Sequence, residues 1–206
     1  MNLFGLFPLR SSKTSATPPI RIKTRAMFVI LAVFLCAGQV WGAEEVYKTA
    51  LFGSSYNSKG VSGYTNVSFS STNDDFTVNV TNANNNNNGW TFIKIGGKNG
   101  AYTGTITTSA AIDKAITKVA LTIDAITASN VTSITLKTST DGSSWVDAGT
   151  FDKSTGAKQV TITSPMENLY YQIEAVCTKG SSNGLLTISK VEYYVEGSGS
   201  GEPVVF

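Results

Sequence analysis

Histidine is absent from all 206 residues of the chain. Imidazole is the base of Ser-His-Asp and Cys-His nucleophile systems, and it is a ligand or partner in many zinc sites, including those of base deaminases. These classes of enzyme are therefore excluded. Glycoside cleavage needs only two carboxylates, but the adjacent pair Asp74 and Asp75 would point to opposite faces of a strand. With no nucleotide-binding glycine loop either, we expect no enzyme.

Arginine is also missing after Arg25. The first 26 residues carry three arginines, two lysines and no acid, whereas the rest has eleven lysines against fourteen acids and thus a formal charge of −3. Nucleic-acid binding depends on clustered basic side chains that neutralise phosphates. We therefore expect no nucleic-acid partner.

A run long enough to cross a bilayer is lacking too. Met27 to Ala37 is an apolar stretch of about eleven residues, the length of a signal-peptide core and too short for a membrane span. Small side chains at Val40 and Gly42 favour cleavage before Ala43. Residues 1–42 are thus predicted to be a signal peptide or leader, and the mature protein is expected to be extracellular or periplasmic, or associated with the cell surface, without membrane insertion. An uncleaved anchor is the alternative.

Cysteine is nearly absent, since Cys177 is the one cysteine after the predicted leader. An internal disulfide is then impossible in the mature chain, so its stability must come from its core. Cys177 ends an alternating apolar series that begins at Leu169, which predicts a buried and unreactive thiol.

Helical periodicity is scarce in the rest of the chain, where apolar residues alternate with polar ones and turns follow at short intervals. The main exception is a predicted helical turn at Ala110 to Ala115. About ten or eleven strands are expected, at residues 46–52, 66–70, 75–81, 90–95, 105–108, 117–122, 133–137, 145–151, 160–162, 169–177 and 185–195.

So many short strands bury one face each only if they pack as two sheets or close into a barrel. The predicted fold class is an all-β sandwich over residues 43–195, followed by a Gly-Ser linker and tail at residues 196–206. Carboxylates at Asp74, Asp75 and Asp113, together with nearby loop carbonyls, are candidate ligands for a structural calcium ion, although no EF-hand spacing is present. Ordinary solvated acids are the alternative.

Two loops are distinguished by their composition. Residues 82–88 contain five consecutive asparagines, and residues 53–64 mix Gly, Ser, Asn and Tyr in a long irregular connection. Both loops could recognise polar ligands, because loops on a rigid scaffold commonly carry binding residues.

The segment Ser139 to Trp145, read as STDGSSW between two predicted strands, resembles the hairpin motif of galactose-binding-like jelly rolls such as the discoidin domains, also called coagulation factor 5/8 C-terminal domains. Residues 169–174 and 184–194 resemble the last strand pair of that fold, so the resemblance covers about residues 116–195. Residues 84–108 are similar to modules of secreted proteins from gut Bacteroidetes. The chain lacks the terminal disulfide and the arginine-rich loops of discoidin domains, which argues against an anionic-lipid ligand.

In such jelly rolls, loops at one end of the sandwich commonly hold the ligand, aromatic rings stacking on sugars. The resemblance therefore implies a non-catalytic carbohydrate-binding module with a glycan or an extracellular protein as partner, and its candidate residues are Trp90, Tyr56, Tyr64, Tyr102 and Asn86. For Trp90, core packing is the alternative, and Trp145 is expected to be structural. A structural or adhesive module, or an accessory domain of a larger secreted hydrolase, are the competing interpretations.

Overall fold

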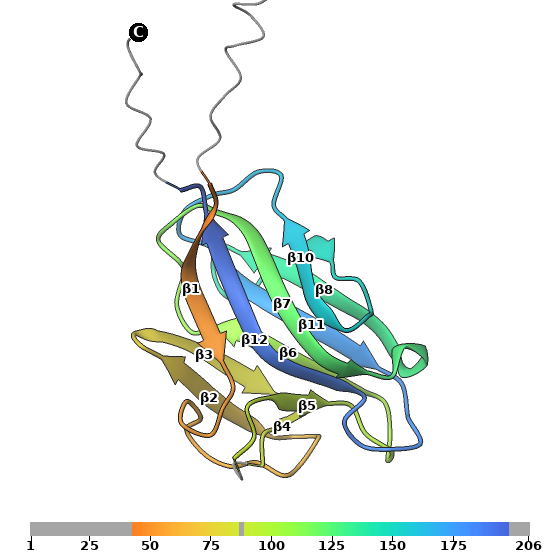
Figure 1. Ribbon diagram of the computed structural model, residues 1–206. Coiled ribbons are helices and arrows are strands. Elements are labelled where there is room, and N and C mark those ends of the chain that lie inside the picture. The colour runs from red at the N-terminus through yellow and green to blue at the C-terminus, as the bar shows by residue number, and fades with distance from the viewer. Residues whose placement is uncertain (1–42, 87–88, 198–206) are drawn as a thin grey trace, which may run out of the picture. The chain divides into compact units, whose positions relative to one another are not determined.

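The structure is a computed structural model that describes residues 43–86 and 89–197 (Figure 1). These residues form a sandwich of two antiparallel β-sheets with no α-helix among them. The fold class predicted from the alternating sequence is therefore confirmed. None of the described residues forms a helix with the length and apolar character of a membrane span. The predicted leader and residues 198–206 of the predicted tail lie outside the described residues.

The first sheet has β12 at its centre. One edge of β12 pairs with β7, and different parts of its other edge pair with β5 and with β1. The strand order is β10-β7-β12-β5-β4, with β1 as a further neighbour of β12. Its strands are β1 (Glu45–Leu51), β4 (Ala83–Asn84), β5 (Ile93–Ile95), β7 (Ile116–Ile126), β10 (Gly156–Thr161) and β12 (Leu186–Val195).

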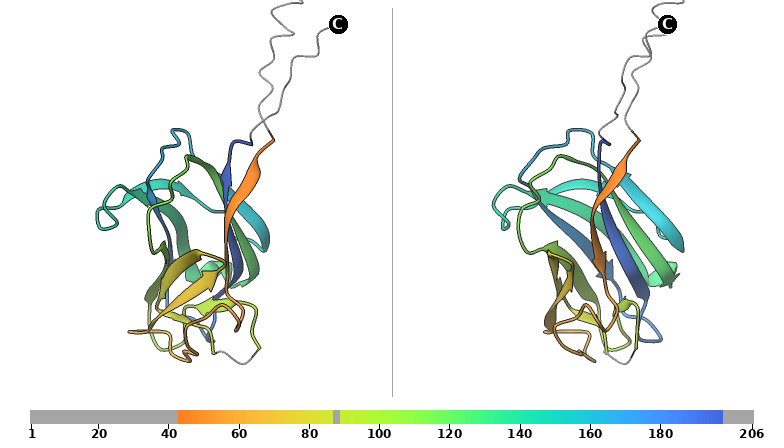
Figure 2. Two further views of the ribbon diagram at one scale, coloured as in Figure 1. Left: turned by 90° about the vertical axis from the view of Figure 1, so that its left-hand side faces the viewer. Right: turned by 60° about the vertical axis from the view of Figure 1, so that its left-hand side comes forward.

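The second sheet packs against the first in the order β2-β3-β6-β11-β8-β9. Its strands are β2 (Ser68–Asn73), β3 (Phe76–Thr81), β6 (Tyr102–Thr108), β8 (Val131–Ser139), β9 (Val146–Thr150) and β11 (Tyr170–Cys177). Three of the connections stay within a sheet, namely β2–β3, β4–β5 and β8–β9, and the others cross from one sheet to the other. The two layers and the loops that join them are clear in the side views of Figure 2.

The core consists of the alternate residues that the sequence pattern assigns to it. In β7, Val119, Leu121 and Ile123 are at most 1% exposed, while the intervening Thr122 is only half-buried. Between the two sheets, the ring of Tyr193 packs edge-on against Phe76 and Tyr171, with centroid distances of 5.4 and 5.7 Å. Because both layers contribute large side chains, the two sheets bury one another without a disulfide.

Two local predictions are wrong. Ala110 to Ala115 forms no helical turn, because Ile112 makes an isolated antiparallel bridge to Leu169 instead. The strand predicted at Trp90 to Ile95 begins only at Ile93, and the short strand β4 was missed because two residues carry no periodicity. A 3-10 turn at Ala128–Asn130 is the one helical element among the described residues.

Cys177 is 1% exposed, as the alternation predicts, and burial raises the pKa of its thiol to about 11. Since the thiolate is the reactive species, this thiol should be almost inert at neutral pH. With Cys36→Ser as background, we expect Ellman's reagent to label Cys177 only when denaturant unfolds the protein. Rapid labelling of one thiol in the absence of denaturant would contradict the burial.

The β8–β9 hairpin explains the residue types of the STDGSSW motif. The Ser139 hydroxyl accepts hydrogen bonds from the backbone N–H of Asp141 and of Gly142, at 3.2 and 2.9 Å. The Asp141 carboxylate in turn accepts the N–H groups of Ser143 and Ser144, at 2.8 and 2.7 Å, and Gly142 has a φ of 72°, which favours glycine. The motif is therefore a self-contained turn.

The backbone N–H groups of Ser144 and Ser143, followed by the hydroxyls of Ser139 and Ser144, hold the pKa of Asp141 well below its usual value. A carboxyl group with a lowered pKa in the folded state stabilises the fold above its unfolded pKa, near 4, and this contribution is lost as the pH falls toward the folded pKa. We therefore expect Asp141→Asn to lose less stability than wild type between about pH 5 and pH 3.

Urea unfolding at several pH values checks this expectation. Asp147→Asn is the matched control, since this exposed carboxylate makes only a 3.8 Å ion pair with Lys137. Parallel pH profiles for wild type and Asp141→Asn would show that the turn does not stabilise the charged form.

Candidate functional site

The five predicted sugar-binding residues lie at one end of the sandwich, which we call the lower end from its place in Figure 1. We define it as residues 53–67, 82–86, 89–102 and 178–185. Backbone hydrogen bonds join these segments: Ser54 N–H to the Trp90 carbonyl, Gly180 N–H to the Gly97 carbonyl, each at 3.1 Å, and Gly184 N–H to the Gly96 carbonyl at 2.9 Å. The lower end is thus a connected surface drawn from four separate parts of the chain.

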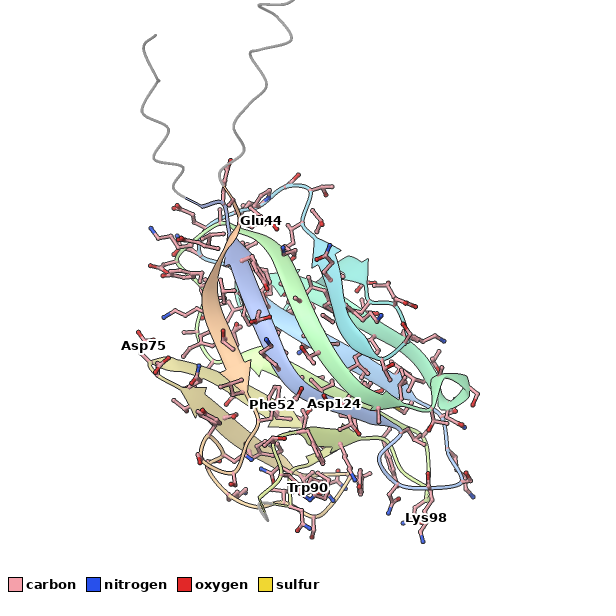
Figure 3. All side chains as sticks on the ribbon, viewed as in Figure 1. Glu44, Phe52, Asp75, Trp90, Lys98 and Asp124 are labelled. Carbon is pink, nitrogen blue, oxygen red and sulfur yellow. The ribbon has the colours of Figure 1, made fainter. Side chains whose placement is uncertain are left out.

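Two aromatic rings and one lysine side chain contact one another at this end. The rings of Trp90 and Phe92 lie 5.0 Å apart between centroids, tilted by 33°. The ammonium nitrogen of Lys94 lies 4.5 Å from the Trp90 ring centroid and 5.4 Å from that of Phe92. We call these three residues the Trp90 platform; Figure 3 labels Trp90 at this end.

Alternation along the chain explains the Trp90 platform. Ile93 and Ile95 of β5 point into the core and are 0% and 1% exposed, so Phe92 and Lys94 face outward. Trp90 precedes the strand, is half-buried and does not belong to the core. The core packing considered for Trp90 is therefore wrong. Phe92 and Lys94 were not predicted as site residues, although their spacing of two from Trp90 was a usable signal.

Tyr56 adjoins the platform through Gly53. A side chain added at Gly53 would have its Cβ 3.4 Å from the Tyr56 ring and 3.8 Å from the Trp90 carbonyl oxygen. The small residue thus lets the ring of Tyr56 and the backbone of Trp90 approach the same point. Both aromatic side chains are half-buried, which leaves part of each exposed to a ligand.

The asparagine run is largely structural where the structure describes it. Asn85 is fully buried; its Oδ1 accepts the Val61 N–H at 2.5 Å and its amide donates to the Lys59 carbonyl at 2.8 Å. Asn84, 6% exposed, donates to the Ser62 carbonyl at 2.7 Å. These two side chains connect β4 to the long 53–67 loop and are unavailable to a ligand. Asn86 is half-buried, and its N–H binds the Val61 carbonyl at 3.1 Å.

Tyr64 and Tyr102 lie in different segments of the lower end and have different neighbours. Burial raises the pKa of Tyr64, partly offset by a hydrogen bond from Asn84. Tyr102 packs over Gly97 and Gly100 at the start of β6. All five predicted residues are thus brought to one end, but contacts group Tyr56 with Trp90 and leave Tyr64 to pack beside Asn84.

A line of contacts runs from Tyr102 to the Trp90 platform. A Cβ at Gly97 would lie 3.0 Å from the Tyr102 ring and 3.1 Å from Asn183 Oδ1, which accepts the Lys98 N–H at 3.0 Å. The next residue, Gly184, packs on the Lys94 side chain. Contacts therefore connect Tyr102 to the Trp90 platform through Gly97, Asn183 and Gly184.

The candidate calcium ligands lie outside the segments of the lower end, and two of the three already have partners. Asp75 and Asp113 line a surface pocket of about 290 Å³, but Asp75 pairs with the Lys48 ammonium at 2.9 Å and Asp113 accepts the Tyr47 hydroxyl at 2.6 Å. These hydrogen bonds, from Lys48 and Tyr47 respectively, are the main reason that the pKa of each carboxyl is lowered. Asp74 occupies the β2–β3 turn at a φ of 53°. Across residues 43–86 and 89–197, no three His, Cys, Asp or Glu side chains gather as a metal site would require, so the geometry gives the calcium prediction no support.

Comparison with known proteins gives neither a matching family model nor a matching curated protein. The chain is therefore described from its structure alone. It is an all-β sandwich whose lower end carries aromatic and lysine side chains.

Proposed function

We propose that this chain is a secreted, non-catalytic module that binds carbohydrate at its lower end. The Trp90 platform is the observation that carries the proposal, because partly exposed aromatic rings next to hydrogen-bonding loop residues suit the apolar face and the hydroxyls of a sugar ring. Lys94 lies on β5, whose Ile93 and Ile95 are buried in the core, and the two rings directly precede this strand, so a rigid element supports the platform.

The resemblance to galactose-binding-like jelly rolls supports the same function. Each of the three connections that follow β9 crosses between the sheets, as jelly-roll strands do, and hydrogen bonds to Ser139 and Asp141 hold the STDGSSW turn. The apolar run at Met27 to Ala37 supports export. The mature protein in this proposal begins at Ala43 and works outside the cytoplasm, either as a free protein or as an accessory domain of a larger secreted hydrolase, with no requirement for calcium.

A protein partner is the competing proposal, and it would call for a large exposed apolar patch. Among the described residues, the exposed large apolar side chains are Val46 on β1, Val146 on β9 and Met166 before β11. Since they come from three separate elements, whereas the aromatic pair lies at one loop end, the side chains favour a glycan.

The purified protein should be tested on an array of plant, host and microbial polysaccharides. We expect binding to at least one class, unchanged by a calcium chelator. Mass spectrometry of the secreted protein should find Ala43 at its N-terminus. Absence of binding to every polysaccharide would reject the proposed function, whatever the N-terminus is.

A further inference from the structure

The lower end is positively charged on a chain that is otherwise acidic. Its segments contain Lys59, Lys94, Lys98 and Lys179, and they contain none of the fourteen acids of the chain. The eleven lysines after residue 42 are therefore divided unevenly along the sequence, because the other seven lie in segments that also contain all fourteen acids. The net charge of −3 after the first 42 residues does not show this uneven distribution, because it sums over all segments.

The lysines of the lower end also differ in their partners. Within the part of the chain that the structure describes, ion pairs engage five of the seven lysines outside the lower end, namely Lys48, Lys118, Lys137, Lys158 and Lys190, and none of the four within it. Lys59, Lys98 and Lys179 are exposed, and the Lys94 ammonium lies against aromatic rings and not against a carboxylate. Their charges are therefore available to a ligand.

Screening makes the local charge more important than the net charge. At physiological ionic strength, charges separated by more than about 8 Å interact weakly across solvent. An anionic ligand that contacts the lower end would therefore be attracted mainly by the lysines it touches, and acids beyond this distance would weaken that attraction little.

We infer that the carbohydrate recognised here is an acidic polysaccharide, one that carries uronate carboxylates or sulfates; this inference rests on the proposed function. Lys94 is the central residue, because its ammonium is held on the rings where a sugar would stack. Lys98 and Lys179 extend the positive surface along the loops that hydrogen bonds join through Gly97 and Gly180. A nucleic acid is less suited to this surface, since four lysines spread over three loops and no arginine offer few phosphate contacts.

The test compares each acidic polysaccharide with its neutralised form. Dissociation constants of the purified protein would be measured for polygalacturonate and its carboxyl-reduced form, and for chondroitin sulfate and its desulfated form, at low and at physiological salt. We expect the charged member of at least one pair to bind roughly tenfold more tightly, and the pair shows whether carboxylate or sulfate is read. The preference should shrink as salt rises.

Lysine substitutions locate the effect. Replacing Lys94, Lys98 and Lys179 together by glutamine should weaken binding of the acidic polysaccharide roughly tenfold, because each exposed charge pair contributes about a factor of two. The matched control replaces Lys114, Lys118 and Lys158, which lie outside the lower end, and should leave the dissociation constant within about twofold.

The outcomes separate the two proposals. Equal binding of charged and neutral forms would overturn the inference and leave the proposed function standing, whereas no binding to any polysaccharide would reject both. Binding of single-stranded DNA as tight as that of the acidic polysaccharide would also overturn the inference. The surface would then recognise negative charge alone and not a charged sugar.

Discussion

Trp90→Ala should weaken carbohydrate binding roughly thirtyfold, which corresponds to about 2 kcal/mol. The substitution removes the larger ring of the Trp90 platform and leaves Phe92 and Lys94 without the partner that holds them at 5.0 and 4.5 Å. Stability should change little, by about 1 kcal/mol, because Trp90 is half-buried and lies outside the core. Isothermal titration with the polysaccharide that binds most tightly, and thermal unfolding of the same sample, measure the two quantities.

Trp145→Ala is the matched control for this prediction. Trp145 is also half-buried, but it belongs to the hairpin at the end of β8, where Ser139 pairs with Tyr170 at the start of β11. The other end of β11, Cys177, pairs with Tyr102 of the lower end, so the two tryptophans lie at opposite ends of the sandwich. Equal losses of affinity in both variants would show that the effect of Trp90→Ala comes from destabilisation and not from a binding surface.

Asn85→Ala should lower the free energy of unfolding by about 2–4 kcal/mol. The side chain of this fully buried residue makes two hydrogen bonds to the 53–67 loop, and without it the Val61 N–H and the Lys59 carbonyl lose their partners. Val61 is 9% exposed, so water cannot readily replace the lost acceptor. Urea unfolding followed by circular dichroism measures the change.

Asn79→Ala is the control for Asn85→Ala, since Asn79 is exposed on β3 and accepts one hydrogen bond from the Ser70 hydroxyl. It should cost less than about 1 kcal/mol. If Asn85→Ala were equally mild, the asparagine run would not brace the loops, and its residues would again be candidates for direct ligand contact.

Much of the architecture could be predicted from the sequence because a half-buried strand leaves a pattern of period two. Phe76, Val78 and Val80 in β3 and Ile134 and Leu136 in β8 are all at most 8% exposed, as their alternation predicts. The sheet partners could not be predicted, since pairing such as that of Leu186 with both Ile95 and Ile126 joins residues far apart in sequence. Local pattern carries no information about such contacts.

The candidate site was predictable in its location but not in its composition. Loop composition identified residues 53–64 and 82–88, and the structure joins both segments, as far as it describes them, at one end. The sequence could not show that Asn85 faces the interior. An asparagine that binds a ligand and one that binds a backbone carbonyl occur in the same kind of loop sequence. Lys94 was missed although its spacing of four from Trp90 places both side chains on one face of the predicted strand, because the ammonium-to-ring contact itself leaves no mark in the sequence.

The most direct test of carbohydrate binding at the lower end is two-dimensional NMR of the labelled protein. Oligosaccharides of the polysaccharide that binds most tightly would be titrated while the indole N–H signals of Trp90 and Trp145 and the backbone signals of Lys98 and Gly184 are followed. We expect the signals of Trp90, Lys98 and Gly184 to shift with one common dissociation constant while that of Trp145 stays in place. Shifts confined to the Trp145 end, or to the strands between the two ends, would contradict the account.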